Sequence, residues 1–157
     1  MRRRQTLPKK KKRGYTMTQT TDLLNEIYTN VEMGCYSLRH IIRICEDRAL
    51  KTLLEQYYDE YQCILEKTND FFRTADKPPR SNGVSSFGVR MAMKANLAID
   101  KTSSHLAEML VQGATMGIID ITRALKDNQS ADEEVRNLAE RLLTHEDRIH
   151  RELRFFV

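Results

Sequence analysis

Apolar residues recur at alternating spacings of three and four along most of the chain. Because an α-helix turns about 100° per residue, this spacing places the members of each run on one helical face. A first run covers residues 20–46, and a second starts after a tight joint near Asp47 and ends before Pro78 and Pro79. The pattern predicts two long amphipathic helices, with Thr20 and Asp22 at the start of the first. The apolar positions of the two runs are Leu24, Ile27, Tyr28, Val31, Cys35, Leu38, Ile42, Cys45, Leu50, Leu53, Leu54, Tyr57, Tyr61, Ile64, Leu65, Thr68, Phe71 and Phe72.

The C-terminal half repeats this organisation. A broad apolar face covers residues 104–127, and a further stripe follows Ser130 and Glu133, whose types and spacing fit a capping box. About five residues join these two segments, and so short a connection predicts helices that are antiparallel neighbours. The inward positions of the last segment are Val135, Leu138, Leu142, Ile149, Leu153 and Phe156.

The link between the two halves, residues 76–103, is much longer. It begins as a loop and continues into an expected short helical stretch with Phe87, Met91, Ala95 and Ala98 on one side. A helix of 26 residues is about 39 Å long, and this link is long enough to return the chain along it. One long crossover between two hairpins distinguishes ferritin-like bundles from up-down-up-down bundles. We therefore expect an all-α, ferritin-like four-helix bundle over residues 17–157, with two antiparallel helix hairpins joined by a long, partly helical crossover.

A short internal repeat agrees with two similar halves. Met33-Gly34, followed by Leu38 and Ile42, matches Met116-Gly117, followed by Ile121 and Leu125, at a constant offset of 83 residues. The repeat predicts that Gly34 faces Gly113 or Gly117 near a pseudo-two-fold axis, where backbones approach closely. A leucine at position 34 would overpack that contact.

Together with the segment His105-Leu-Ala-Glu-Met-Leu-Val-Gln-Gly-Ala-Thr-Met-Gly-Ile118, these features resemble a group of bacterial ferritin-like proteins of unknown function, over about residues 20–156. The resemblance implies the ferritin-like fold and brings no established reaction. Other members of that superfamily hold two iron or manganese ions with a Glu on each of two helices and a Glu-x-x-His pair on each of the other two.

Most of those ligands are missing from this sequence. The second helix has no histidine, and its nearest fragment is Glu60-x-x-Cys63. Glu32 of the first helix lies on the flank of the apolar face. The last helix is the exception, because Glu146 lies on the inward stripe and His150 follows one turn later.

Two interpretations of Glu146 remain open. In one, Glu146 and His150 form a remnant or unusual iron or manganese site, completed by Glu32 or Glu60. In the other, Glu146 accepts a hydrogen bond from Tyr28, Tyr57 or Tyr61 or pairs with His150, because burying an unpaired charge is costly. We favour the second interpretation and expect no cofactor.

Composition narrows the class of protein. Apolar residues make up 40% of the 157, enough for one domain to bury a core without metal or disulfide support. The longest apolar run is far shorter than the roughly 20 residues of a membrane-spanning helix, and no apolar signal core is present near Met1. The three cysteines, Cys35, Cys45 and Cys63, fit neither a zinc knuckle nor a Cys-x-x-Cys motif. We expect a cytoplasmic protein with free cysteines.

The basic charge is confined to the N-terminus. Residues 1–16 contain eight of the 26 basic residues and no acid, so residues 17–157 have 18 basic against 22 acidic residues, a net charge of −4. A block of like charge is typical of a disordered tail that binds nucleic acid or anionic lipid. Lys12-Arg13-Gly14 also lies just before Met17, where purine-rich codons would serve as a ribosome-binding site. We therefore favour a disordered tail or an upstream start artefact, and expect nucleic-acid binding only if residues 2–13 are genuinely expressed.

The expected function is that of a non-catalytic interaction or assembly module. The third helix carries more apolar surface than one bundle core covers, which predicts a homodimer through its surplus face. That surplus consists of Met109, Met116, Ile118 and Ile119.

Overall fold

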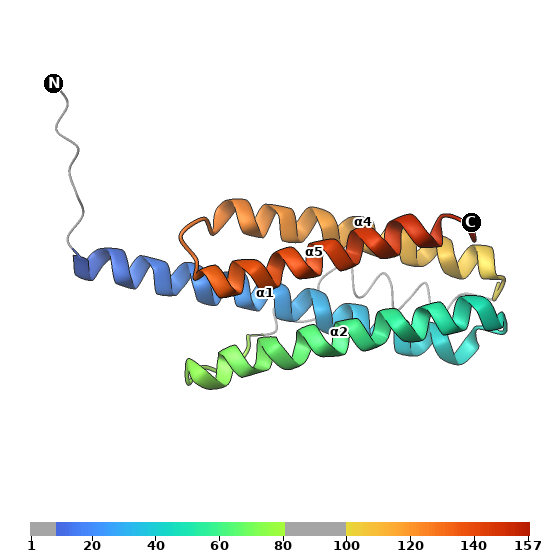
Figure 1. Ribbon diagram of the computed structural model, residues 1–157, viewed down its shortest axis with the longest axis horizontal. Coiled ribbons are helices and arrows are strands. Elements are labelled where there is room, and N and C mark those ends of the chain that lie inside the picture. Colours follow the sequence, from blue (N-terminus) through green and yellow to red (C-terminus); the bar gives the residue numbers. More distant parts are fainter. Residues whose placement is uncertain (1–8, 81–99) are drawn as a thin grey trace, which may run out of the picture.

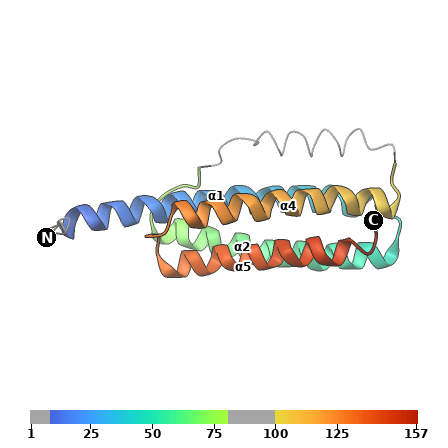
Figure 2. The same ribbon diagram turned by 90° about the horizontal axis from the view of Figure 1, so that it is seen from above.

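The computed structural model describes residues 9–80 and 100–157, except for the side chains of residues 9–13 and 15. Four helices and no strand occur in these two ranges: α1 (Lys9–Ile44), α2 (Arg48–Thr74), α4 (Ser103–Asp127) and α5 (Glu133–Leu153). The helices lie side by side in one bundle, and the first turns of α1 project beyond it (Figures 1 and 2). For the described part of the chain, the prediction of four long helices and no strand is confirmed.

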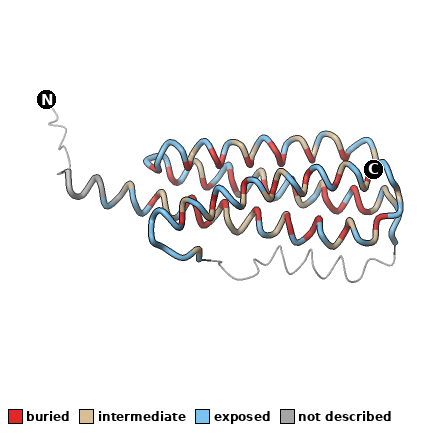
Figure 3. The backbone as a smooth tube through the Cα atoms, turned by 60° about the horizontal axis from the view of Figure 1, so that its bottom comes forward, coloured by how far each residue is buried: buried red, intermediate tan, exposed pale blue. Residues whose placement is uncertain are grey.

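The predicted apolar stripes form the core. Buried positions on each helix face the other helices, whereas exposed positions lie outside (Figure 3). All the predicted positions of α1 and α2 are either buried or packed against this core, including Cys35 and Cys45, and Cys63 is exposed as a free thiol. The largest fully buried side chains are Leu23, Ile27, Leu38, Ile41, Leu50, Leu54, Tyr57, Ile64, Leu106, Ile121, Leu142 and Leu153.

The helix boundaries differ from the predicted ones at two places. α1 begins at Lys9 rather than near Thr20, so part of the expected tail is helical. Thr20 is not a cap, because its hydroxyl donates to the Thr16 carbonyl and accepts from the backbone N–H of Asp132 at 2.8 Å. The predicted capping box of Ser130 and Glu133 is also wrong: Asp132 is the N-cap, and its carboxylate accepts from the N–H of Glu134 at 2.9 Å.

Contacts between side chains show which helices are neighbours and which of their parts lie side by side. The ring of Tyr28 meets Phe72 at one end of the seam between α1 and α2, and Arg39 donates to the hydroxyl of Tyr58 nearer the other end. α4 packs along α5, and α1 also contacts both of these helices. The polar side chain of Gln19 holds the loop between α4 and α5, because its Oε1 accepts from the N–H of Ser130 at 2.7 Å.

The described ends of the link between α2 and α4 are held far apart. The backbone N–H of Arg80 donates to Oδ1 of Asn25 at 2.9 Å, whereas the hydroxyl of Ser103 donates to Oδ2 of Asp47 at 3.1 Å. Asn25 is 19 residues before the end of α1 at Ile44, about 29 Å along the helix, and Asp47 lies beyond that end. The predicted helical stretch from Phe87 to Ala98 lies outside the described residues.

Candidate functional site

A hydrogen-bonded pair of buried polar side chains lies at the centre of the bundle. The hydroxyl of Tyr61 on α2 donates to Oε1 of Glu146 on α5 at 2.6 Å. Tyr61 is 4% exposed and Glu146 is 2% exposed, because both lie on the inward stripes of their helices. The structure therefore confirms the sequence-based hypothesis that Glu146 points inward to a core tyrosine, and it selects Tyr61 from the three alternatives.

Two glycines make room for this pair. A Cβ atom added to Gly34 of α1 would lie 2.5 Å from Cζ of Tyr61, and one added to Gly117 of α4 would lie 2.8 Å from Cδ of Glu146. Real Cβ contacts are not this short, so neither position has space for a side chain. The neighbour of Gly34 is thus the ring of Tyr61, while Gly34, Gly113 and Gly117 all line the pocket described below; a direct approach of two glycines stays a prediction. The repeated Met-Gly motif instead places each glycine against one member of the polar pair.

Burial governs the protonation of both groups. It raises the pKa of Glu146 from 4.5 to about 8, although the hydrogen bond from Tyr61 opposes the shift. Burial also raises the pKa of Tyr61 well above 10, and the nearby Glu146 carboxylate adds to this rise. Glu146 is consequently a neutral carboxylic acid over most of the physiological range, with a proton to donate.

His145 is a functional-site residue that the sequence analysis missed. It is 4% exposed, and its ring lies edge-on to Tyr61 with the two centroids 4.5 Å apart. Its Nε2 lies 3.1 Å from the carbonyl oxygen of Tyr57, and since a carbonyl only accepts, this nitrogen must carry the proton. Burial lowers the pKa of His145 from 6.5 to about 4, which keeps the ring neutral. The spacing of apolar residues could have indicated it, because residue 145 follows Leu142 by three and precedes Ile149 by four, which places it on the inward face of α5.

Three of the four proposed metal-ligating residues, Glu32, Glu60 and Glu146, have hydrogen-bond partners of their own. Glu32 accepts a hydrogen bond from the hydroxyl of Tyr28 at 2.7 Å on the surface. Glu60 accepts from Nε of Arg141 at 2.7 Å, and this bond is the main reason that its pKa is lowered. His150 is half-buried one turn beyond Glu146. Within residues 9–80 and 100–157, no three or more His, Cys, Asp or Glu side chains are grouped so as to hold a metal ion.

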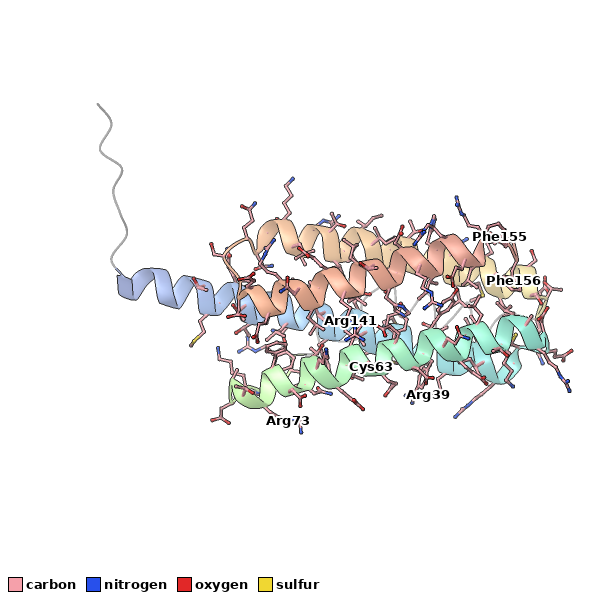
Figure 4. The ribbon with its side chains drawn as sticks, in the orientation of Figure 1. Arg39, Cys63, Arg73, Arg141, Phe155 and Phe156 are labelled. Carbon is pink, nitrogen blue, oxygen red and sulfur yellow. The ribbon has the colours of Figure 1, made fainter. Side chains whose placement is uncertain are left out.

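The contact between Glu60 and Arg141 belongs to the seam between α2 and α5. Figure 4 shows Arg141 extending from α5 toward α2, on the side where Cys63 lies. The guanidinium interacts with both Glu60 and Cys63, and the former is the main reason that the pKa of Arg141 is raised. A Glu60 carboxylate that is paired in this way neutralises an arginine at the surface and is not available to the buried pair.

A pocket of about 150 Å³ lies between α1 and α4 and reaches down to the buried pair. We call it the α1–α4 pocket. Its walls are largely apolar, and its polar groups come from α1, α4 and the buried pair. The lining residues are Glu26, Thr29, Asn30, Met33, Gly34, Ser37, Leu38, Tyr61, Leu110, Gly113, Ala114, Gly117, Asp120, Glu146 and Ile149. Small residues at 34, 113, 114 and 117 leave the space that the pocket occupies.

The polar groups of this pocket are mainly acidic. Burial raises the pKa of Glu26, and the negative charges of Asp120 and Asp22 raise it further. Asp120 is 3.8 Å from the exposed guanidinium of Arg123, and no ion pair to Glu26 is found within the described residues. The pocket therefore holds two carboxyl groups, Glu26 and Asp120, that repel each other, and a third, Glu146, at its floor.

None of the helices in the described part of the chain is long and apolar enough to cross a membrane. Comparison with known proteins yields no matching family model, no matching curated protein and no matching solved structure.

Proposed function

We propose that the chain is a ferritin-like four-helix bundle, with two antiparallel hairpins and a long crossover, that acts as a non-catalytic binding module. The order of contacts along α1 and α2, from Tyr28 with Phe72 to Arg39 with Tyr58, supports the first hairpin. The separate anchoring of Arg80 and Ser103 supports a connection that joins opposite ends of the bundle. This arrangement is the one that the resemblance to ferritin-like proteins implies.

The α1–α4 pocket is the observation that carries the binding function. Pockets that bind small molecules are concave and mostly apolar, with a few polar groups that fix orientation. In this pocket Leu38, Leu110 and Ile149 supply apolar wall, and Asn30 and Glu146 supply polar groups. A volume of about 150 Å³ is comparable with a cavity that accepts a benzene-sized molecule. The preferred ligand is accordingly small.

Glu146, whose pKa burial raises to about 8, does not by itself supply a reaction. Acid–base catalysis needs a reacting group within hydrogen-bond reach of the proton donor and a second group that completes the transfer. His145 is occupied by the Tyr57 carbonyl, and Tyr61 is held neutral by its high pKa. Binding without chemistry is the function that these groups support best.

NMR of ¹³C-labelled methionine methyl groups tests the binding function. Met33 lines the pocket, whereas Met116 is 37% exposed on α4 and does not. Titration with n-butanol should shift the Met33 signal, assigned with Met33→Leu, and leave the Met116 signal in place. If Met33 and Met116 respond alike, or neither responds up to the solubility of the probe, the binding function is wrong.

Self-association is a second candidate function. Met116 is 37% exposed and Ile119 is 43% exposed on α4, which makes part of the predicted surplus face accessible, although Met109 is buried. An apolar surface of this kind is what a homodimer would cover. Light scattering of the full chain should give a dimer, and Met116→Glu with Ile119→Glu should give a monomer. A monomer at high micromolar concentration of the unaltered chain would refute this candidate.

A further inference from the structure

The floor of the α1–α4 pocket offers a buried carboxyl group to whatever occupies it. Oε1 of Glu146 accepts the hydroxyl of Tyr61, whereas Oε2 has no hydrogen-bond partner among the described residues. No fully enclosed side-chain oxygen or nitrogen in the described part of the chain lacks a partner. Oε2 is thus not sealed in the core, and since Glu146 lines the pocket, we infer that Oε2 faces it. A polar group at that point can bind the free oxygen.

The walls of the pocket above Glu146 carry two more acidic side chains. Glu26 and Asp120 stand on opposite walls, on α1 and α4, close enough for the charge of Asp120 to raise the pKa of Glu26. Among the residues that the structure describes, no lysine, arginine or histidine lines the pocket. A cation between these walls would relieve the repulsion of the two carboxylates, and an anion would add to it. The charge of the pocket therefore favours cationic ligands over anionic ones.

The shape of the pocket selects among cations. Met33, Leu38, Leu110 and Ile149 line it with apolar surface, which a hydrated metal ion does not match. Within residues 9–80 and 100–157 no grouping of metal-ligating side chains is present either. An ammonium group attached to a short hydrocarbon fits both requirements, since the carbon chain covers the apolar wall while the nitrogen donates to carboxylate oxygens.

We propose that the α1–α4 pocket binds a small primary amine in its ammonium form, with Glu146 as the acceptor at the floor and with Glu26 and Asp120 as the supporting charges. This inference rests on the proposed binding function and names its ligand class. The volume limits the hydrocarbon part to about four to six carbons. Asn30 supplies a further polar contact, because its Oδ1 would lie only 3.1 Å from a Cβ on Gly117, beside the Glu146 carboxyl.

Three probes of equal chain length test the ligand class: n-butylammonium, n-butanol and butyrate. Dissociation constants come from the Met33 methyl shift of the full chain at pH 8.5. At this pH the amine is charged, and Glu146, whose pKa is about 8, is largely ionised. The other titratable groups that line the pocket within the described residues are Glu26, Asp120 and Tyr61, and the ring of His145 packs edge-on against Tyr61. Butylammonium should bind at least about tenfold more tightly than butanol, because a charge-assisted hydrogen bond is about twice as strong as a neutral one.

The variants separate the role of Glu146 from general effects on the fold. Glu146→Gln keeps the size of the side chain and should reduce the preference for butylammonium over butanol at least about tenfold. Glu152→Gln is the matched control, because Glu152 is likewise on α5 and accepts a tyrosine hydroxyl from α2, that of Tyr57 at 2.7 Å, yet does not line the pocket. Its preference should stay unchanged. The double variant Glu26→Gln with Asp120→Asn removes the supporting charges at half-buried positions, so folding should tolerate it, and should also lower the preference.

The outcomes distinguish a failure of the ligand class from a failure of the binding function. If butanol or butyrate binds as tightly as butylammonium, or if Glu152→Gln loses the preference as fully as Glu146→Gln, the ammonium class is overturned and the pocket stands. If none of the three probes moves the Met33 signal, the binding function fails together with the ligand class.

Discussion

Replacing Glu146 by Gln should make the protein more stable, and increasingly so as the pH rises. Glutamine has the shape of the protonated acid and can still accept the hydroxyl of Tyr61 through its carbonyl oxygen. It cannot ionise, so the variant escapes the cost of a buried negative charge. The difference in unfolding free energy between variant and unaltered chain therefore isolates the titration of this one group.

The sign and size follow from the pKa. Burial raises the pKa of Glu146 from 4.5 to about 8, so its neutral form favours folding below pH 4.5 and this advantage is lost as the pH rises through 8. Between these values the folded chain holds one proton more than the unfolded chain, and stability falls by about 1.4 kcal/mol per pH unit. The interval of about 3.5 pH units gives an upper limit of about 5 kcal/mol for the pH-dependent difference in unfolding free energy. Water that enters the pocket reduces the cost of the buried charge, so we expect a difference of about 2 to 5 kcal/mol.

Urea denaturation at pH 5, 7 and 8.5 measures this difference. Glu146→Gln should match the unaltered chain within about 1 kcal/mol at pH 5 and exceed it by about 2 kcal/mol or more at pH 8.5. Glu152→Gln serves as a control, because its hydrogen bond from Tyr57 lowers the pKa of Glu152, and the difference should be constant from pH 6 to 8.5. A difference for Glu146→Gln that does not change between pH 5 and 8.5 would refute the claim that the carboxyl is buried and neutral.

Three further predictions concern other parts of the chain. Gly34→Ala should destabilise the fold by about 1 to 3 kcal/mol in urea denaturation, because the new methyl group collides with the ring of Tyr61; Gly14→Ala, which meets nothing within 4 Å, should be neutral or slightly stabilising, and equal effects would contradict the packing. Protein purified without a histidine tag after iron-rich growth should contain no stoichiometric Fe, Mn or Zn by elemental analysis, and one or two bound ions per chain would revive the metal site. Full-length chain and a chain started at Met17 should bind DNA equally in low salt, and tighter binding of the full-length chain would make residues 2–13 a nucleic-acid-binding segment.

The sequence was sufficient for the core and for the direction of Glu146. Rotation about a helix axis is fixed by the spacing of apolar residues, so most inward positions of the four helices followed from their stripes, and Glu146 followed as a member of one. Met109 and His145 are exceptions, because both are buried. The partner of Glu146 did not follow, because Tyr28, Tyr57 and Tyr61 all lie on inward faces. Choosing among them needs the axial position of one helix against another, and that depends on packing.

The remaining differences have local causes. Thr20 has the residue type of a helix cap, yet α1 continues through it, and its hydroxyl binds the Thr16 carbonyl and the backbone of Asp132 instead. The role of Gly34 depended on which helix lies opposite, and that helix is α2 with Tyr61. The partnership of Glu60 with Arg141 joins positions 81 residues apart on two helices, so no short motif indicates it. The pocket itself depends on the relative placement of small residues from α1 and α4.

A crystal structure of the full chain grown with n-butylammonium at pH 8.5 tests the central claim most directly. It should show the Tyr61 hydroxyl about 2.6 Å from Oε1 of Glu146 and the amine nitrogen within hydrogen-bond distance of the other carboxylate oxygen, between α1 and α4. A pocket filled by the protein's own side chains, or a Glu146 carboxylate turned away from Tyr61 onto a metal ion, would contradict it.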